Sequence, residues 1–598
     1  MRSITLVIIW LFAAISISTV AQPRLAFTDL VNGPAQGLGD GLGQGAIITV
    51  WGYQLGDTPG QVTVTDSAGV TRPAAYVYYW KKADGQLPGG PANLYSSHQL
   101  YEVAFSLPTS ALGSAQIQLQ TANGENSNAL PFAVINGRIF HVKTGGNNSN
   151  SGSFSAPWQY INGDASGVKA PGNGGLLAGD LVYSHGTLEK LDYVNGVLNG
   201  RAGVFLRSLN GRADAHIALV SYPGTQAKVE SPSWGIHPYV STGIVVSKYD
   251  IRGGIIDEDP LSTSYVPPGS TSTAQITASA YGRIVGNFLG ELAGKCSNGW
   301  AGAIVASEAQ SDQLMVHGNE IADIGCNQTS HFHHTTYFTR RTQTGAAATQ
   351  AGEFSWNYLH DNKAKYGIHY YDQTNDSSKA CDPVIGTLKI HDNYIVNQRS
   401  VGISVQTSSS YAAAPCWSMD TEIYQNVLIN TGLGPIAELN NGTQPYAMYL
   451  GGAIAGNFKL YNNLIDGVSD EASRKYQTPA VLAFITTRNS ELSLYNNVIQ
   501  PRYAMPLTTN AATVPSSMQF NLLSTDVTLR FSQAFLQRLT ASTALNYQAD
   551  PQISSQGTVS LAPTSPAIGK GQRNTEVDFY GRTVSSDNPE IGPVRYEP

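Results

Sequence analysis

The fold is decided by a short motif that returns as Ile390-His-Asp-Asn393-Tyr-Ile, Ile423-Tyr-Gln-Asn426-Val-Leu, Leu460-Tyr-Asn-Asn463-Leu-Ile and Leu494-Tyr-Asn-Asn497-Val-Ile. Each copy contains a hydrophobic residue, two variable residues, an Asn, one more residue and a second hydrophobic residue. Earlier copies are Val316-His-Gly-Asn319-Glu-Ile and Phe354-Ser-Trp-Asn357-Tyr-Leu, with Val285-Gly-Asn287-Phe one residue short and Ile251-Arg-Gly-Gly254-Ile-Ile carrying Gly in place of Asn. Successive Asn residues lie 32 to 38 residues apart. A fixed short core with a variable period predicts stacked coils whose turns carry insertions.

A second strand-like run follows each Asn. Because side chains alternate between the two faces of a strand, one half of each run should face the interior. The residues expected inside are Ile368, Tyr370, Ile403, Val405, Met448 and Leu450, and those expected outside are His369, Ser404 and Tyr449. The repeated Asn predicts a ladder in which each amide bonds to the coils on either side of it. A chance run of Asn-rich turns is the alternative.

The composition favours an all-β protein of two or three domains. The chain has 598 residues, of which 61 are Gly and only 13% are charged, a balance unlike that of long-helix proteins. The formal net charge is −7 and no basic run occurs, so we expect no nucleic-acid partner.

The N-terminus has the pattern of a secretory signal. Arg2 precedes the apolar run Ile4 to Ile17, and Thr19-Val-Ala21 is a small-x-small cleavage pattern. We expect a signal peptide of residues 1–21 and a secreted or periplasmic mature chain, with an uncleaved membrane anchor as the alternative. No later run is long and apolar enough to span a bilayer, so no membrane association is expected after cleavage.

The four cysteines fit the same coil register. Cys296 and Cys326 follow Asn287 and Asn319 by 9 and 7 residues, and Cys381 and Cys416 follow Asn357 and Asn393 by 24 and 23. Similar offsets in adjacent coils place the members of each pair close together. The sequence therefore predicts disulfides Cys296–Cys326 and Cys381–Cys416, in keeping with an oxidising compartment. No Cys-x-x-Cys spacing occurs, and we expect no metal at the cysteines.

Residues 22–135 are predicted to form a small β-sandwich, because short alternating runs are separated by Gly, Pro and Asp turns. The segments Gly45-Ala-Ile-Ile-Thr-Val-Trp-Gly-Tyr53 and Asn123-Gly-Glu-Asn-Ser-Asn-Ala-Leu-Pro-Phe-Ala-Val134 resemble the two ends of IPT/TIG domains, an immunoglobulin-like group. The resemblance implies a spacer or an interaction module.

Residues 136–598 resemble the right-handed parallel β-helix proteins of the pectate-lyase-like superfamily. The likeness rests on Phe140-His-Val-Lys-Thr-Gly-Gly-Asn-Asn-Ser-Asn150, Ala178-Gly-Asp-Leu-Val-Tyr-Ser-His-Gly186, Ser565-Pro-Ala-Ile-Gly-Lys-Gly571 and Asp578-Phe-Tyr-Gly581. It implies an N-terminal cap, a solenoid and a C-terminal closing segment. The superfamily contains lyases, hydrolases, epimerases and inert fibres, so the fold alone does not give the function.

Polar outward residues gather on two consecutive coils, around His331-Phe-His333-His334 and Lys365-Tyr366-Gly-Ile-His369. In the predicted register Tyr337 and His369 are neighbours on strands about 4.8 Å apart, and so are His334 and Tyr366. The alternative is that these side chains only cover the sheet.

The cluster suggests cleavage of a uronate polymer by β-elimination, which needs a cation for the carboxylate, a base and an acid. His369 could be the base because its pKa is tunable near neutrality, and Tyr337 the acid, or the roles could be reversed. The cations would be Arg340, Arg341 and Lys365, with His334 beside the centre. Substrate binding is assigned to Tyr366, Tyr371, Tyr449, Trp356, Asp372, Glu308 and His333.

Two other readings stay open. A glycoside hydrolase needs two carboxyl groups, for which Asp372 with Glu308 is the available pair, and a uronan epimerase shares the proton abstraction. A non-catalytic glycan-binding or surface protein would leave its polymer intact. No cofactor is expected; the acidic run Asp257-Glu-Asp-Pro260 could bind calcium, although a solvated turn explains it as well. We expect a polysaccharide substrate and a monomeric protein.

Overall fold

The computed structural model describes residues 22–161, 175–188, 193–194, 197–198, 202–231, 234–239, 241–253, 273–277, 280–291, 301–307, 313–326, 333–340, 351–372, 387–407, 417–432, 446–452, 454–467, 480–486, 490–501, 505–509, 517–523, 546–554 and 557–597. Within them the chain is all-β apart from the short helix α1 (Leu94–His98). In this part of the chain we find no helix with the length and apolar character needed to span a bilayer. The predicted signal peptide and the acidic run at 257–260 lie outside the described residues.

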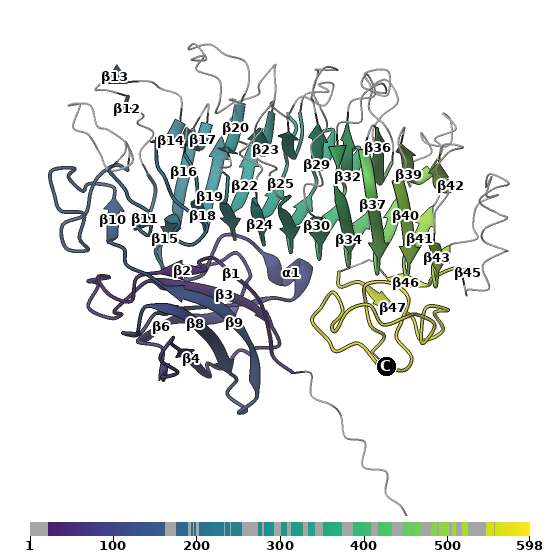
Figure 1. Cartoon of the computed structure of the whole chain (residues 1–598), viewed down its shortest axis with the longest axis horizontal. Coiled ribbons are helices and arrows are strands. Elements are labelled where there is room, and N and C mark those ends of the chain that lie inside the picture. The colour runs from purple at the N-terminus through teal and green to yellow at the C-terminus, as the bar shows by residue number, and fades with distance from the viewer. Residues whose placement is uncertain are drawn as a thin grey trace, which may run out of the picture.

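The larger part of the molecule is a parallel β-helix, as predicted. Each coil contributes one strand to each of three parallel sheets, which we name sheets A, B and C in the order in which the chain passes through them (Figure 1). Sheet A contains β10 (Ile139–Lys143), β11 (Leu181–His185), β15 (Ile217–Ser221), β18 (Ile244–Ser247), β21 (Arg283–Val285), β24 (Met315–His317), β27 (Glu353–Ser355), β30 (Thr387–His391), β34 (Asp420–Tyr424), β37 (Ile454–Tyr461), β40 (Ser490–Tyr495) and β43 (Ser517–Gln519), with β33 (Trp417–Ser418) beside β37. Sheet B contains β16 (Ala227–Ser231), β19 (Tyr249–Gly253), β22 (Phe288–Glu291), β25 (Glu320–Ala322), β28 (Tyr358–His360), β31 (Tyr394–Val396), β35 (Val427–Ile429), β38 (Leu464–Gly467), β41 (Val498–Pro501), β44 (Leu522–Leu523) and β45 (Tyr547–Gln548). Sheet C contains β14 (Ala202–Arg207), β17 (Trp234–Tyr239), β20 (Thr273–Thr277), β23 (Ala301–Ser307), β26 (Thr336–Arg340), β29 (Tyr366–Asp372), β32 (Val401–Thr407), β36 (Met448–Gly452), β39 (Ala480–Thr486) and β42 (Met505–Thr509).

The predicted Asn ladder lies in the turn between each sheet A strand and the sheet B strand that follows it. Asn393 donates from Nδ2 to Oδ1 of Asn426 at 2.9 Å and to the Phe354 carbonyl at 3.0 Å, while its own Oδ1 accepts from Asn357 at 2.9 Å. These bonds satisfy amides that are buried and would otherwise destabilise the turn. The ladder residues are Asn287, Asn319, Asn357, Asn393, Asn426, Asn463, Asn497, Asn521 and Asn546. The prediction is confirmed, and the ladder runs two coils past Asn497.

Two motif assignments at the N-terminal end are wrong. Ile284 rather than Val285 holds the first hydrophobic position, because Ile284 pairs with Val316, so the copy around Asn287 has full length. Ile251 belongs to the sheet B strand β19 and pairs with Leu289, beyond the ladder turn. Because hydrophobic residues occur on both sides of the turn, the motif could be aligned to the sequence in more than one register.

The core fills the space between the three sheets. All six residues predicted to point inward from sheet C lie in one buried hydrophobic cluster, which confirms the alternation along these strands: Ile368, Tyr370, Ile403, Val405, Met448 and Leu450. Neighbouring coils thereby bury surface that no single coil could bury alone.

The N-terminal part forms two sheets packed face to face, compatible with the predicted sandwich. One sheet orders β1 (Arg24–Thr28), β3 (Ile47–Tyr53), β7 (Tyr101–Ser106) and β6 (Tyr76–Lys82); the other orders β2 (Asn32–Gly33), β9 (Asn126–Val134), β8 (Gly113–Gln120), β4 (Gln61–Thr65) and β5 (Thr71–Pro73). The immunoglobulin-like type stays a prediction. Two small pairs complete the strands: β12 (Tyr193–Val194) with β13 (Val197–Leu198), and β46 (Ile553–Ser554) with β47 (Ser560–Leu561).

The sandwich is fixed to the β-helix through buried polar groups. The Lys248 ammonium lies 3.7 Å from an Asp29 carboxylate oxygen and donates to Thr49 Oγ1 at 2.6 Å. Arg283 donates to the backbone carbonyls of Thr28 and Asp29 at 2.8 and 3.2 Å. Breaking these contacts would leave buried charges unpaired, so separation of the two parts is unfavourable.

The closing segment also reaches the sandwich. Tyr53 donates its hydroxyl to the Phe579 carbonyl at 3.2 Å, and Arg24 forms an ion pair with Glu576 at 3.1 Å. Figure 1 shows the sandwich and the yellow C-terminal segment on the same side of the β-helix.

Candidate functional site

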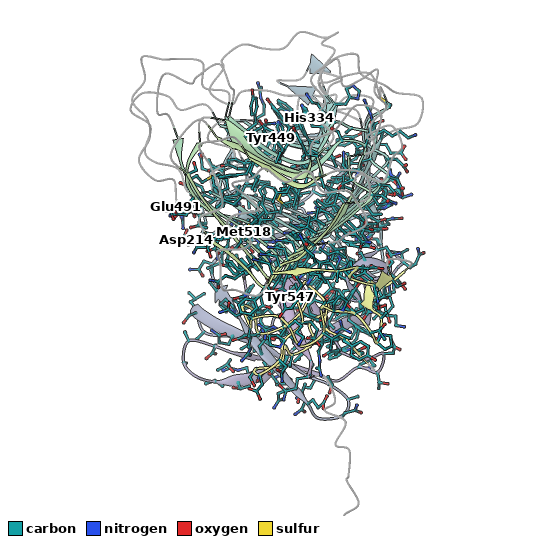
Figure 2. The ribbon with its side chains drawn as sticks, turned by 90° about the vertical axis from the view of Figure 1, so that its right-hand side faces the viewer. Asp214, His334, Tyr449, Glu491, Met518 and Tyr547 are labelled. Atoms are coloured by element: carbon teal, nitrogen blue, oxygen red, sulfur yellow. The ribbon has the colours of Figure 1, made fainter. Side chains whose placement is uncertain are left out.

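The predicted cluster of imidazole and phenol rings exists on the outer face of sheet C. Because Phe338 of β26 pairs with Tyr370 of β29, Tyr337 and His369 occupy one row of the sheet. Their ring centroids are 5.4 Å apart, and those of His334 and Tyr366 are 5.2 Å apart. The two predicted neighbour pairs are therefore confirmed. Figure 2 places His334 on the side of the β-helix opposite the sandwich.

His369 is the centre of this cluster. Its ring lies 4.0 Å from Tyr366, 5.1 Å from His334 and 5.2 Å from Tyr371, measured between centroids. Only 2% of His369 and 3% of Tyr337 are exposed, so the prediction of an exposed wall is wrong. The two side chains do point away from the core, but the packed rings cover one another.

The electrostatics of the cluster are unusual. Burial, and then the positive charge of Lys365, hold the pKa of His369 well below its ordinary value, so its imidazole is neutral at pH 7. Its Nδ1 atom has no hydrogen-bond partner among the described residues. Burial also lowers the pKa of Lys365 to about 8, and its ammonium lies 5.0 Å from the centre of the Tyr366 ring. Within the described part of the chain Lys365 forms no ion pair, although it is only 8% exposed.

The row continues along sheet C. His369 pairs with Ser404, which pairs with Tyr449, and Tyr449 stacks on Tyr446 with centroids 5.6 Å apart. Tyr449 is half-buried and is also labelled on this side in Figure 2. Burial raises the pKa of Tyr366, and a hydrogen bond with the Gln406 side chain, which lowers the pKa, offsets that rise only in part.

For two other predicted site residues the structure describes only the backbone. Arg340 and Asp372 pair with each other at the ends of β26 and β29, and nothing is described of their side chains. Arg341 and Glu308 lie outside the described residues. The proposed carboxyl pair for hydrolysis is therefore not tested.

Trp356 does not join this cluster, so its assignment there is wrong. It lies in the ladder turn between β27 and β28, and its indole N–H donates to the Tyr53 hydroxyl at 3.0 Å. Its ring also stacks on Phe27 of the sandwich with centroids 5.1 Å apart. The position of the Trp356 side chain depends on its contacts with the sandwich, which the repeated Asn motif cannot predict.

His333 is fully buried beside Glu291, the last residue of the sheet B strand β22, and Cys326, which follows the next strand β25. Its donor atoms, with those of Glu291 and Cys326, lie within 4.8 Å of one another, a spacing that suits a metal ion. However, Cys326 is disulfide-bonded and offers no thiolate, and Glu291 accepts the backbone N–H of Gly325 at 2.7 Å. The donor set does not fit a metal site in this oxidised form. Cys296, Cys381 and Cys416 lie outside the described residues, so both predicted pairings stay predictions.

A second constellation was not singled out from the sequence. It surrounds a cavity of about 460 Å³ between the sandwich, sheet A and the closing segment. The rings of His391, Tyr424, Tyr461 and Tyr495 stack in one column along sheet A, with centroids 4.5, 4.7 and 5.1 Å apart and planes within 4° of parallel. The available signal was the aromatic residue two positions before the ladder Asn in consecutive motif copies.

Neither a protein-family model nor a curated protein sequence matches the chain. A solved structure described as "The complex structure of XylC with xylose" is similar over 76% of this chain and 98% of that chain, with 10% identity and a TM-score of 0.36. At these values the likeness carries no argument about chemistry, and the assignment of a parallel β-helix rests on the strand pairing described above.

Proposed function

We propose that this protein is a secreted or periplasmic enzyme that cleaves an acidic polysaccharide by β-elimination on the outer face of sheet C. The observation that carries the proposal is Lys365, a residue only 8% exposed that has no ion-pair partner among the described residues and lies in the same cluster as the neutral His369. Burial lowers the pKa of Lys365, which means that its charged form is partly desolvated and would be stabilised by an anion that pairs with it. The carboxylate of a uronate residue is such an anion.

The groups present match the three tasks of the reaction. Lys365 pairs with the uronate carboxylate and stabilises the negative charge that develops beside it. His369 removes the proton on the carbon next to that carboxylate, and Tyr337 gives its hydroxyl proton to the departing glycosidic oxygen. The C–H electron pair becomes the new C=C bond as the C–O bond breaks. His369 leaves the step protonated and Tyr337 deprotonated, and proton exchange with water restores both.

Access to His369 is part of the proposal. A polymer reaches the imidazole only when the covering rings move aside, and Tyr371 and Tyr449 are the half-buried members of this face. Movement of such side chains is fast compared with enzyme turnover. Once displaced, the same rings can stack on sugar residues on either side of the bond that is cleaved.

The assay is a panel of acidic polysaccharides followed by the ultraviolet absorbance of the unsaturated uronate product. We expect one or more polymers to give this signal, and we expect His369→Gln and Tyr337→Phe to abolish it. Tyr495→Phe, a phenol in the same fold but on sheet A, is the matched control and should retain full activity. Full activity in both sheet C variants would discard these residue roles.

The same assay separates the other functions. New reducing ends without ultraviolet absorbance would indicate a glycoside hydrolase, and exchange of the carbon-bound proton without cleavage would indicate an epimerase. Polymer that binds but stays unchanged would indicate a glycan-binding protein.

We also propose the domain division 22–135 and 136–598, removal of residues 1–21, and a monomeric state. The disulfide at Cys326 supports an oxidising compartment. N-terminal sequencing of exported protein should begin at Gln22, and light scattering should give the mass of one chain.

A further inference from the structure

The cavity on sheet A is built from three parts of the chain that are far apart in sequence. Its lining residues are Arg24, Leu25, Ala26, Tyr53, Asn128 and Leu130 of the sandwich, Trp356, His391, Asp392, Tyr424, Gln425 and Tyr461 of the β-helix, and Asn574, Thr575, Glu576, Val577 and Asp578 of the closing segment. A volume of about 460 Å³ is within the range of small-molecule sites in proteins. The cavity is separate from the proposed active centre, which lies on sheet C.

The charged groups around this cavity are already paired. Arg24 binds Glu576 at 3.1 Å across it. The His391 imidazole lies between two carboxylates, with Nδ1 2.8 Å from Asp392 and Nε2 3.2 Å from Glu353. Burial opposes protonation of this imidazole, but the two hydrogen bonds raise its pKa to about 9, so it is a cation at neutral pH.

Asp578, the remaining carboxylate of the lining, is paired as well. It forms an ion pair with Arg582 at 2.5 Å and accepts the backbone N–H of Tyr580 at 3.0 Å. Each lining charge that we describe therefore has a partner, and the cavity offers an ionic ligand little advantage.

The polar groups of the lining that can still accept or donate a hydrogen bond to a ligand are neutral. The hydroxyls of Tyr424 and Tyr461 have no hydrogen-bond partner among the described residues, and burial raises the pKa of both phenols, so both stay protonated. Gln425 donates its Nε2 to the Val577 carbonyl at 2.9 Å, which fixes the amide and leaves Oε1 as an acceptor. Two donor–acceptor hydroxyls and one amide oxygen are thus presented beside aromatic rings.

We propose that this cavity is a second binding site, for a neutral and hydroxyl-rich ligand such as a short neutral saccharide. Hydroxyl groups can exchange hydrogen bonds with phenols and with an amide oxygen, whereas a charged ligand would have to break existing ion pairs. The stacked column holds Tyr424 and Tyr461 in place before any ligand arrives, which reduces the entropy lost on binding. The inference does not depend on the chemistry proposed for sheet C.

The test is isothermal titration calorimetry of the full chain with neutral di- and hexasaccharides of glucose, xylose, mannose or galactose. We expect saturable binding of at least one of them. The double variant Tyr424→Phe/Tyr461→Phe keeps the ring column but removes both hydroxyls, and its affinity should fall by about tenfold or more. Tyr495→Phe makes the same change in the same column outside the lining, and its affinity should equal that of the wild type.

Two further arms make the outcome decisive. Lys365→Met should bind the neutral saccharide as the wild type does, because that residue lies on sheet C. The inference is overturned if no neutral saccharide binds or if the double variant keeps wild-type affinity. It is also overturned if uronate oligosaccharides of equal length bind Lys365→Met more tightly than neutral ones do and lose that binding when Tyr424→Phe/Tyr461→Phe is added. None of these results would affect the ultraviolet assay for lyase activity, so the two proposals fail separately.

Discussion

Replacing Lys365 with Met should make the protein more stable and inactive at once. Burial lowers the pKa of the Lys365 ammonium from 10.5 to about 8. At 1.36 kcal/mol for each pKa unit, the charged form is disfavoured in the folded state by about 3 kcal/mol. The substitution also removes the contact of the ammonium with the Tyr366 ring, which contributes about 1 kcal/mol. The unfolding free energy at pH 7 should therefore rise by about 2 kcal/mol, because Met fills a similar volume without a charge.

The pH dependence identifies the cause. The folded-state pKa of Lys365 lies below the unfolded value, so the energetic cost is fully present below about pH 8 and disappears as the pH rises to 10.5. The stability advantage of Lys365→Met should shrink across this interval. Guanidinium unfolding of both proteins, followed by tryptophan fluorescence at several pH values, measures that difference.

Lys363→Met is the matched control. Lys363 is exposed and lies two residues away, so its substitution should change stability by no more than about 0.5 kcal/mol at any pH. A Lys365→Met variant that is less stable than the wild type at pH 7 would refute the reasoning, because it would reveal an anion already paired with the ammonium. A gain in stability that does not vary with pH would refute it as well.

The remaining predictions concern the supports of the fold. Asn393→Ala removes hydrogen bonds to both neighbouring coils of the ladder and should lower the unfolding free energy by about 2–4 kcal/mol. Asn457 is exposed, and Asn457→Ala should have little effect. Equal melting curves for the two variants would contradict a stabilising role of the ladder. His391, with a pKa raised to about 9, stabilises the fold fully below pH 6.5 and loses this contribution as the pH rises through 9. Relative to His391→Gln, the wild type should therefore lose about 3 kcal/mol across that interval, and a constant difference would show that the imidazole is not charged in the fold. Cys326→Ser should lower stability by about 2–4 kcal/mol, and peptide mapping by mass spectrometry should join Cys326 to Cys296; a bond to another cysteine would correct the predicted pairing.

The coil register could be predicted from the sequence because it depends on local patterns. The Asn spacing marks the ladder turns, and alternation along each following strand assigns the two faces, which is why Tyr337 and His369 could be matched across 32 residues. Side chains at equivalent positions of stacked strands must be neighbours, whatever the intervening loops contain.

The burial of the same residues could not be predicted, because it depends on contacts that alternation does not specify. His369 is covered by rings from two strands and from the segment before β26, and no single strand pattern indicates how closely they pack. Trp356 was misassigned because its position depends on docking of the sandwich, whose Tyr53 is 303 residues away in sequence. The second cavity was missed for the same reason, since its walls come from three distant segments.

The contacts of the sandwich with the closing segment join residues 552 positions apart, at Arg24 and Glu576. A growing or exported chain cannot form this contact until Glu576 has been made available, so the contact is among the last of the fold to form. In the folded protein the same contacts oppose unfolding that starts from the closing segment. Unfolding of coils from the C-terminal end would have to break the hydrogen bond between Tyr53 and Phe579, so we expect residues at the start of the chain to protect that end from proteolysis.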